Sequence, residues 1–250
     1  MLTQVDALVD RSRLVDGHPT SLLDLGYDHV GLDDAWQACG TGVNGSFHDK
    51  DGNPLVNVKA FPNMTAMNDY AHHKGVKSGW YLNNCICEES GQLRRNWLQQ
   101  MQGDVDALIR YGYDSVKLDG CGPANDTWLW AKLINKTGKP ILIENCGNTY
   151  PGSDSEIPGI FKWNVSGPAE VEDLKPLQRC PMNFYRSGTD GRSSWKGTLR
   201  NVNSQVPFLK VSQPGTPAAP PGWQASSSSS SSSLVEVAPA CCCRDFRMFC

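Results

Sequence analysis

A short unit recurs along the chain, in which a helical stretch ends at glycine and a β-branched run follows that ends in polar residues. Its two best copies are residues 26–33 and 112–119, and looser copies are residues 75–83 and 138–145. Repeated units of helix, glycine and strand are typical of parallel strands joined by crossover helices. We therefore expect an α/β fold built on a parallel (β/α) barrel.

The stretch before residues 112–119 has the periodicity of a helix. Met101, Val105, Leu108 and Ile109 are spaced at i, i+4, i+7 and i+8, which places four apolar side chains on one face of a helix. Gly112 follows them, where a glycine C-cap would end the helix. Helix and strand are thus expected to alternate in this region.

Polar residues end each of the four expected strands. They are Asp33-Asp34, Asn83-Asn84, Asp119 and Glu144-Asn145. Because the carboxyl ends of barrel strands lie at one face of the barrel, where active sites are found, these residues are expected to share one pocket.

The composition changes near residue 210. Of the 250 residues, 39% are hydrophobic and 20% charged, which suits one globular domain that we place at residues 1–210. Residues 214–222 are rich in proline, residues 226–233 are all serine, and cysteines cluster at the end. We expect residues 211–250 to form a disordered, low-complexity tail. A linker with a metal-binding or lipidated end is the alternative to a cloning, splicing or frame artefact.

Charge and hydropathy exclude some partners. The 23 basic and 26 acidic residues include no basic block, so nucleic acid is not an expected partner. No apolar stretch is long enough to span a bilayer, and the N-terminus lacks the pattern of a signal peptide. The oligomeric state is left open.

Two features favour an oxidising compartment. Five Asn-x-Ser/Thr triplets are present, at Asn44, Asn63, Asn125, Asn135 and Asn164, and such triplets are glycosylation acceptors in secreted proteins. Cys85 and Cys87 are too close for the usual Cys-x2-Cys zinc pair and lack a second such pair. Disulfide bonds are therefore expected in preference to a metal site.

Asp119 and Asp190 are the candidate catalytic residues. Glycoside hydrolysis needs two carboxylates, one of which protonates the leaving oxygen. Asp119 ends an apolar strand, and Lys117 lies two residues before it on the same face, where a cation would keep the carboxylate ionised. Asp190 follows Arg186 by four residues, so an extended path would again bring the two side chains to one face. Asp119 is the expected nucleophile and Asp190 the expected acid/base.

Asp33, Asp34 and Trp36 are better suited to binding than to bond cleavage. The adjacent carboxylates would accept hydrogen bonds from neighbouring sugar hydroxyls, and the indole would offer an aromatic plane to the apolar face of a pyranose. A solvated turn at Asp33-Asp34, a helix cap at Asp119 and a simple turn at Asp190 are the structural alternatives.

Four segments resemble motifs of the family 27 glycoside hydrolases, which are α-galactosidases and α-N-acetylgalactosaminidases. Residues 32–36, Leu-Asp-Asp-Ala-Trp, resemble the family's Asp-Asp-Cys-Trp motif. Residues 73–81 are similar to its next strand, residues 116–121 to its nucleophile segment, and residues 180–190 to its acid/base segment. The four segments occur in the family's order, and the resemblance covers roughly residues 5–210.

The resemblance implies a (β/α)8 TIM barrel that releases terminal α-linked galactose with retention, from oligosaccharides or glycoconjugates, without a metal or cofactor. It implies a secreted, lysosomal or vacuolar protein. It also implies that Cys121 pairs with Cys85 or Cys87, and that Cys146 pairs with Cys180. The residues that would contact the sugar are Asp33, Asp34, Tyr81, Lys117 and Arg186.

The chain departs from the family pattern in several places. Ala35 replaces a cysteine, and Gly147-Asn148 stands where many members have an acidic or amide residue followed by tryptophan, a position that helps to select galactose or N-acetylgalactosamine. The first strand and the last barrel strands are not recognisable, so we expect an incomplete barrel in which residues 1–25 provide only the first helix. A sugar-binding protein without turnover and an inactive truncated homologue are the alternative functions.

Overall fold

The computed structural model describes residues 1–83, 87, 97–120, 124, 126–146, 183–186, 194–203 and 224–225. Within these residues the main sheet has six parallel strands in the order β3-β4-β5-β6-β7-β8. They are β3 (His29–Gly31), β4 (Lys77–Leu82), β5 (Ser115–Asp119), β6 (Leu142–Cys146), β7 (Phe184–Arg186) and β8 (Gln224–Ala225). The expected α/β class with a parallel sheet is confirmed, and each of the four recurring units supplies one strand.

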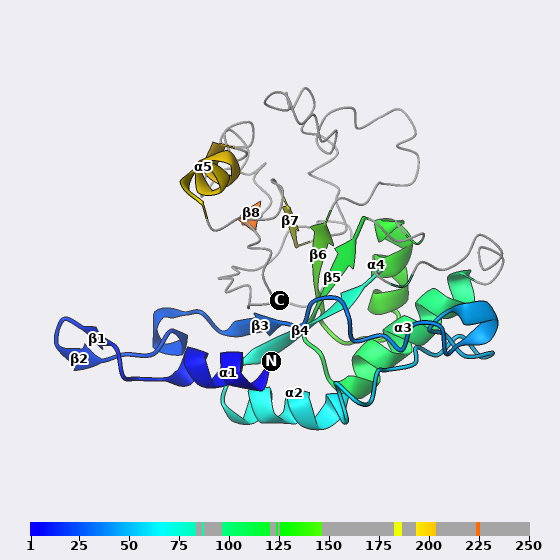
Figure 1. Cartoon of the computed structure of the whole chain (residues 1–250), viewed down its shortest axis with the longest axis horizontal. Helices are drawn as coiled ribbons and strands as arrows, with labels where there is room; N and C mark the ends of the chain where they lie inside the picture. The colour runs from blue at the N-terminus through cyan, green and yellow to red at the C-terminus, as the bar shows by residue number, and fades with distance from the viewer. Residues whose placement is uncertain are drawn as a thin grey trace.

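Helices alternate with these strands as the sequence predicts. Helix α2 connects β3 to β4, α3 connects β4 to β5, and α4 connects β5 to β6, and each packs against the next along the outside of the strands (Figure 1). Their bounds, with the other helices and the 3-10 turns, are α1 (Leu2–Val9), η1 (Leu23–Leu25), η2 (Val43–Gly45), α2 (Met64–His73), α3 (Trp97–Tyr111), α4 (Thr127–Asn135) and α5 (Trp195–Asn203).

Helix ends follow from local hydrogen bonding. Asn63 and Asp126 are the N-caps of α2 and α4, and their side chains accept hydrogen bonds from backbone amides in the first turn, which removes two unsatisfied donors. Helix α3 ends at Gly112, whose φ of 89° is readily adopted only by glycine. The expected C-cap is therefore confirmed.

The core lies between the sheet and the helices. In β5, Val116 and Leu118 are buried on the helix side, whereas Lys117 and Asp119 are half-buried and face the other way, as the alternation of a strand requires. A second, smaller cluster holds α1 against β3 and α2, and it consists of Val5, Leu8, Val30, Ala71 and Val76. The apolar stripe of α3 is buried as expected, with Ile109 at its partly buried edge.

Two regions differ from the sequence expectation. Residues 1–25 contain more than a helix, because β1 (Leu14–Val15) and β2 (His18–Pro19) pair as an antiparallel hairpin. The two-residue turn between them, Asp16-Gly17, has positive φ at both positions, the backbone that two-residue hairpins favour. In the expected tail, Gln224–Ala225 pair with β7 as the short strand β8, a pairing that the composition does not predict.

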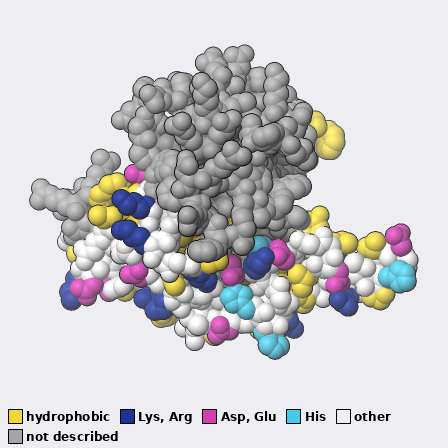
Figure 2. Space-filling view, turned by 180° about the vertical axis from the view of Figure 1, so that it is seen from behind, with side chains coloured by type: hydrophobic (Ala, Val, Ile, Leu, Met, Phe, Trp, Pro, Cys, Tyr) yellow, Lys and Arg dark blue, Asp and Glu magenta, His cyan; other side chains and the backbone are white. Residues whose placement is uncertain are grey.

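The surface of the described part carries charges of both signs. On the face shown in Figure 2, acidic and basic side chains are interspersed over the visible described residues. No helix in the described ranges is long and apolar enough to cross a bilayer.

Candidate active site

The register of the central strands brings the predicted polar residues together. Tyr81 on β4 is paired with Lys117 on β5, which is paired with Glu144 on β6. Two residues further along, Asp119 is paired with Cys146. Since side chains two residues apart on a strand share a face, Lys117 and Asp119 lie on the same face, as the sequence predicts.

Asp119 and Tyr81 are in direct contact. The Tyr81 hydroxyl donates a hydrogen bond of 2.9 Å to Oδ2 of Asp119. Burial of the phenol, together with the charges of Asp119 and Asp34, raises the pKa of Tyr81 far above its ordinary value. Tyr81 is therefore a neutral donor across the working pH range and fixes the direction of the Asp119 carboxylate.

Lys117 forms an ion pair with Asp33 at the exposed edge of the site. Its ammonium lies 3.2 Å from Oδ2 of Asp33 and 5.0 Å from the centre of the Tyr81 ring, within cation–π range. The Lys117 side chain is only 11% exposed, against 65% for Asp33. Burial alone would lower the pKa of Lys117, but the charges around it, led by Glu144 and including Asp119, raise it on balance.

Asp33 and Asp34 follow β3 and form a tight turn. The amide of Asp34 donates to Oδ1 of Asp33 at 2.8 Å, and the amide of Ala35 donates to Oδ1 of Asp34 at 2.9 Å. Ala35 has a φ of 78°, in the left-handed region that alanine rarely adopts. The chain thus holds an uncommon backbone conformation beside two carboxylates at the edge of the site.

Trp36 packs in the core on the other side of the sheet. Its ring is fully buried, 4.4 Å from the ring of Trp80 and 5.6 Å from that of Phe47. Its Nε1 donates a 2.8 Å hydrogen bond to the carbonyl oxygen of Tyr81. The indole has no exposed face for a sugar, so the stacking role expected for Trp36 does not fit its position. Trp36 instead supports the backbone of Tyr81.

Two further polar residues of the site, Asn83 and Glu144, were recognised in the sequence only as polar strand ends. Both are buried, with exposures of 6% and 4%. Asn83 is hydrogen-bonded to the backbone of Asp119, the last residue of β5, and of Ala124, and Glu144 is the strongest of the charges that raise the pKa of Lys117. The sequence feature that indicated these two residues was their position at the carboxyl ends of the expected strands.

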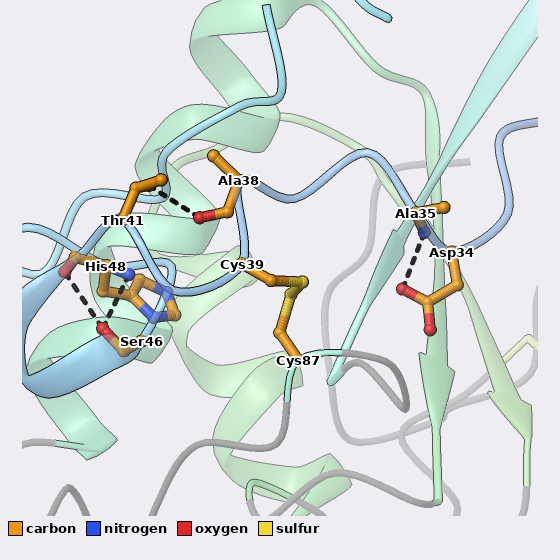
Figure 3. The surroundings of a disulfide bond; sticks show 8 residues. All are labelled: Asp34, Ala35, Ala38, Cys39, Thr41, Ser46, His48 and Cys87. Atoms are coloured by element: carbon orange, nitrogen blue, oxygen red, sulfur yellow. Dashed lines mark hydrogen bonds between the residues drawn. A yellow bond between two sulfur atoms is a disulfide. The ribbon is translucent and has the colours of Figure 1, made fainter.

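A disulfide bond between Cys39 and Cys87 ties the loop after β3 to the loop after β4 (Figure 3). This bond corrects the expectation that Cys87 could pair with Cys121, and the pairing of Cys121 with Cys85 falls outside the described residues. Cys146 is buried at the end of β6, and its expected partner Cys180 lies outside the described residues.

The expected acid/base, Asp190, lies outside the described residues. Arg186 ends β7, and its neighbour Tyr185 is paired with Asn145 of β6, which places the backbone of Arg186 beside the end of β6. Among the described residues, no group of three His, Cys, Asp or Glu side chains is placed to hold a metal ion.

Solved structures share this fold over part of their length. An α-galactosidase from Saccharomyces cerevisiae, solved with raffinose, matches with a TM-score of 0.50 and 19% identity over 77% of this chain and 36% of its own. A Bacteroides fragilis protein named for the α-galactosidase/melibiase class matches with a TM-score of 0.54 and 20% identity over 89% of this chain and 41% of its own. The α/β sheet therefore corresponds to part of an α-galactosidase barrel domain.

Curated relatives agree with this comparison. Alpha-N-acetylgalactosaminidase from Gallus gallus is 26% identical over 76% of this chain and 43% of its own length. Alpha-galactosidase A from Cellvibrio japonicus is 28% identical over 76% and 44%. Alpha-galactosidase from Oryza sativa subsp. japonica is 31% identical over 70% and 42%. The chain thus spans less than half the length of each of these relatives.

The profile of one protein family matches residues 14–157, more than half of the chain. That range contains Asp33, Asp34, Tyr81, Lys117 and Asp119. The chain therefore belongs to this family, Melibiase_2, described as alpha galactosidase A, which corresponds to the α-galactosidases and α-N-acetylgalactosaminidases of glycoside hydrolase family 27.

Proposed function

We propose that the chain carries the galactose-binding and nucleophilic part of a retaining α-galactosidase, with terminal α-linked galactosides as substrates. The observation that supports this proposal best is the Asp119 carboxylate at the carboxyl end of β5, held by the Tyr81 hydroxyl at 2.9 Å. In a parallel barrel this edge is where catalytic residues are found.

In the proposed reaction, Oδ1 or Oδ2 of Asp119 attacks the anomeric carbon, and the bond to the leaving oxygen breaks as that oxygen takes a proton from Asp190. Water then gives a proton to Asp190 and attacks the same carbon, which releases Asp119 and galactose. Two displacements at one carbon retain its configuration.

The other residues would hold the sugar. Asp33 and Asp34 carry carboxylate oxygens at the rim of the site, and Lys117 brings a buried ammonium to Asp33. The hydroxyl groups of a sugar would donate hydrogen bonds to the two aspartates and accept one from the lysine. The place of Arg186 at the end of β7 is compatible with the sugar contact that we expect of it.

The direct test is hydrolysis of 4-nitrophenyl α-galactoside, with NMR used to identify the anomer that is released first. We expect α-galactose from the intact protein and no release from Asp119→Asn. An activated α-galactoside should label Asp119 covalently, as mass spectrometry of the peptides would show. Labelling at another carboxylate, or β-galactose as the first product, would refute the assignment.

The curated relatives include α-galactosidases and α-N-acetylgalactosaminidases, so the N-acetylated substrate is the second candidate. The ratio of kcat/KM for the 4-nitrophenyl α-galactoside and its N-acetyl analogue decides between them. A sugar-binding protein without turnover would bind galactose in calorimetry but release no nitrophenol.

A further inference from the structure

We propose that Asn83 is a positioning residue for the nucleophile, because its side-chain amide holds the backbone at Asp119 and at Ala124. This inference rests on the proposed function, since it concerns how Asp119 is held for attack.

The side-chain amide of Asn83 makes one hydrogen bond to the backbone of each of these two residues. Its Nδ2 donates to the carbonyl oxygen of Asp119, and its Oδ1 accepts from the backbone amide of Ala124 at 2.8 Å. A carbonyl oxygen can only accept and a backbone N–H can only donate, so both contacts require the same orientation of the amide. With Asn83 only 6% exposed, water competes little for either bond.

The backbone of Asn83 suits this role. Its φ is 55°, in the left-handed region that asparagine adopts more readily than most residues. Asn83 comes directly after Leu82, the last residue of β4, so its left-handed backbone terminates the strand. Its hydrogen bonds show that the side chain reaches across to the end of the neighbouring strand β5.

Asp119 is therefore held at two points, by Tyr81 in β4 and by Asn83, which directly follows β4. Tyr81 binds its carboxylate, and Asn83 binds its main-chain carbonyl. Nucleophilic attack requires the reacting atoms to be aligned at about 3 to 3.5 Å, so a loosened main chain would slow attack. The sugar contacts that we propose come from Asp33, Asp34, Lys117 and Arg186, so binding of galactose would change little.

The test compares Asn83→Gly with a matched control, Asn44→Gly. Glycine keeps the left-handed backbone without strain and removes the side chain that makes both hydrogen bonds. Asn44 has a φ of 53° but is exposed in η2, away from the site. Both variants are made without glycosylation, because Asn44 begins an Asn-Gly-Ser triplet.

Three quantities are measured on each protein: hydrogen exchange at the Ala124 amide by NMR, the rate of covalent labelling of Asp119 by an activated α-galactoside, and the affinity for galactose. Asn83→Gly should speed exchange and slow labelling, each by about tenfold, the effect of losing a buried hydrogen bond, while galactose affinity stays within about twofold. Asn44→Gly should change none of the three.

Unchanged exchange at Ala124 in Asn83→Gly would overturn the anchoring role of Asn83. Faster exchange with unchanged labelling would overturn its role in positioning the nucleophile. If the wild-type protein is not labelled while Asn83→Gly still speeds exchange, the proposed function fails and the catalytic role of Asn83 fails with it, whereas the anchoring contact stands.

Discussion

The Tyr81 hydroxyl donates a 2.9 Å hydrogen bond to Oδ2 of Asp119 from the neighbouring strand. The same tyrosine receives the Trp36 indole hydrogen bond on its backbone and the Lys117 ammonium over its ring. Tyr81 thus lies between the buried core on one face of the sheet and the charged residues on the other, and its hydroxyl is its contact with the Asp119 carboxylate.

Removal of this hydroxyl in Tyr81→Phe should slow covalent labelling of Asp119 by about 10- to 100-fold, since a hydrogen bond to a charged group contributes about 1.5 to 3 kcal/mol. The matched control is Tyr70→Phe, because the Tyr70 hydroxyl also donates to a carboxylate, that of Asp6, but on the exposed outer surface. Equal labelling rates for the two variants would contradict the role of Tyr81.

Glu144→Gln should destabilise the protein and make it more sensitive to alkali. The pKa of Lys117 is raised above its usual value, because charges led by Glu144 outweigh the lowering effect of burial. The stability that Lys117 contributes is therefore complete below the unfolded pKa of about 10.4 and is lost as the pH rises through the folded pKa above it. Without Glu144 the folded pKa falls, so this loss begins at lower pH.

Urea unfolding between pH 7 and 11 measures this effect. We expect Glu144→Gln to lose about 1 to 3 kcal/mol of unfolding free energy at pH 7 and to lose stability earlier than the wild type as the pH rises. The control is Asp51→Asn, which removes the partner of the exposed Lys50, because exposed ion pairs contribute little. Parallel pH profiles for wild type and Glu144→Gln would refute the coupling to Lys117.

Cys39→Ala should lower the free energy of unfolding by about 2 to 4 kcal/mol, the typical contribution of a disulfide bond. The Cys39–Cys87 bond closes a loop with a sequence separation of 48, and that closure is lost in the variant. Chemical denaturation under oxidising conditions provides the measurement. Cys87→Ala and the double variant should each match Cys39→Ala, and an additional loss in the double variant would show that the two sulfurs are not bonded to each other.

Gly103→Ala should destabilise the packing of α3 against the loop before α2. A Cβ at Gly103 would lie 2.0 Å from the carbonyl oxygen of Gly52, far inside any contact distance. Because the obstacle is backbone, we expect a loss of about 2 kcal/mol or more. Gln102→Ala on the same helix is the control, with a change below about 0.5 kcal/mol. A similar melting temperature for the two variants would contradict this close approach.

The architecture near the site could be read from the sequence because it depends on local signals. The alternation in residues 115–119 places Val116 and Leu118 on one face and Lys117 and Asp119 on the other, and the structure confirms it. The end of α3 at Gly112 follows from the same kind of local rule.

The position of Trp36 could not be read in this way. An aromatic residue after two carboxylates suits both a sugar platform and a core side chain, and the difference depends on which face of β4 it packs against. That contact involves Trp80, 44 positions further along the chain. The pairing of Cys39 with Cys87 depends likewise on how two loops meet in space, which the spacing of cysteines does not specify.

The pairing of β8 with β7 had no signal in the sequence either. Gln224 and Ala225 stand between a proline-rich run and a serine run, so composition favours a chain without structure. Their pairing gives hydrogen-bond partners to backbone groups at the edge of β7. Backbone groups need such partners whatever side chains the residues carry.

The Cys39–Cys87 bond also has a consequence for the order in which the site is assembled. Both cysteines precede Asp119 in the chain, so the bond that joins the two loops can form without any residue of β5. Tyr81 and the Asp33-Asp34 turn would then be held near each other, and β5 would pair with the edge of β4 that is already in place. Asp119 would be the last of these residues to join the site.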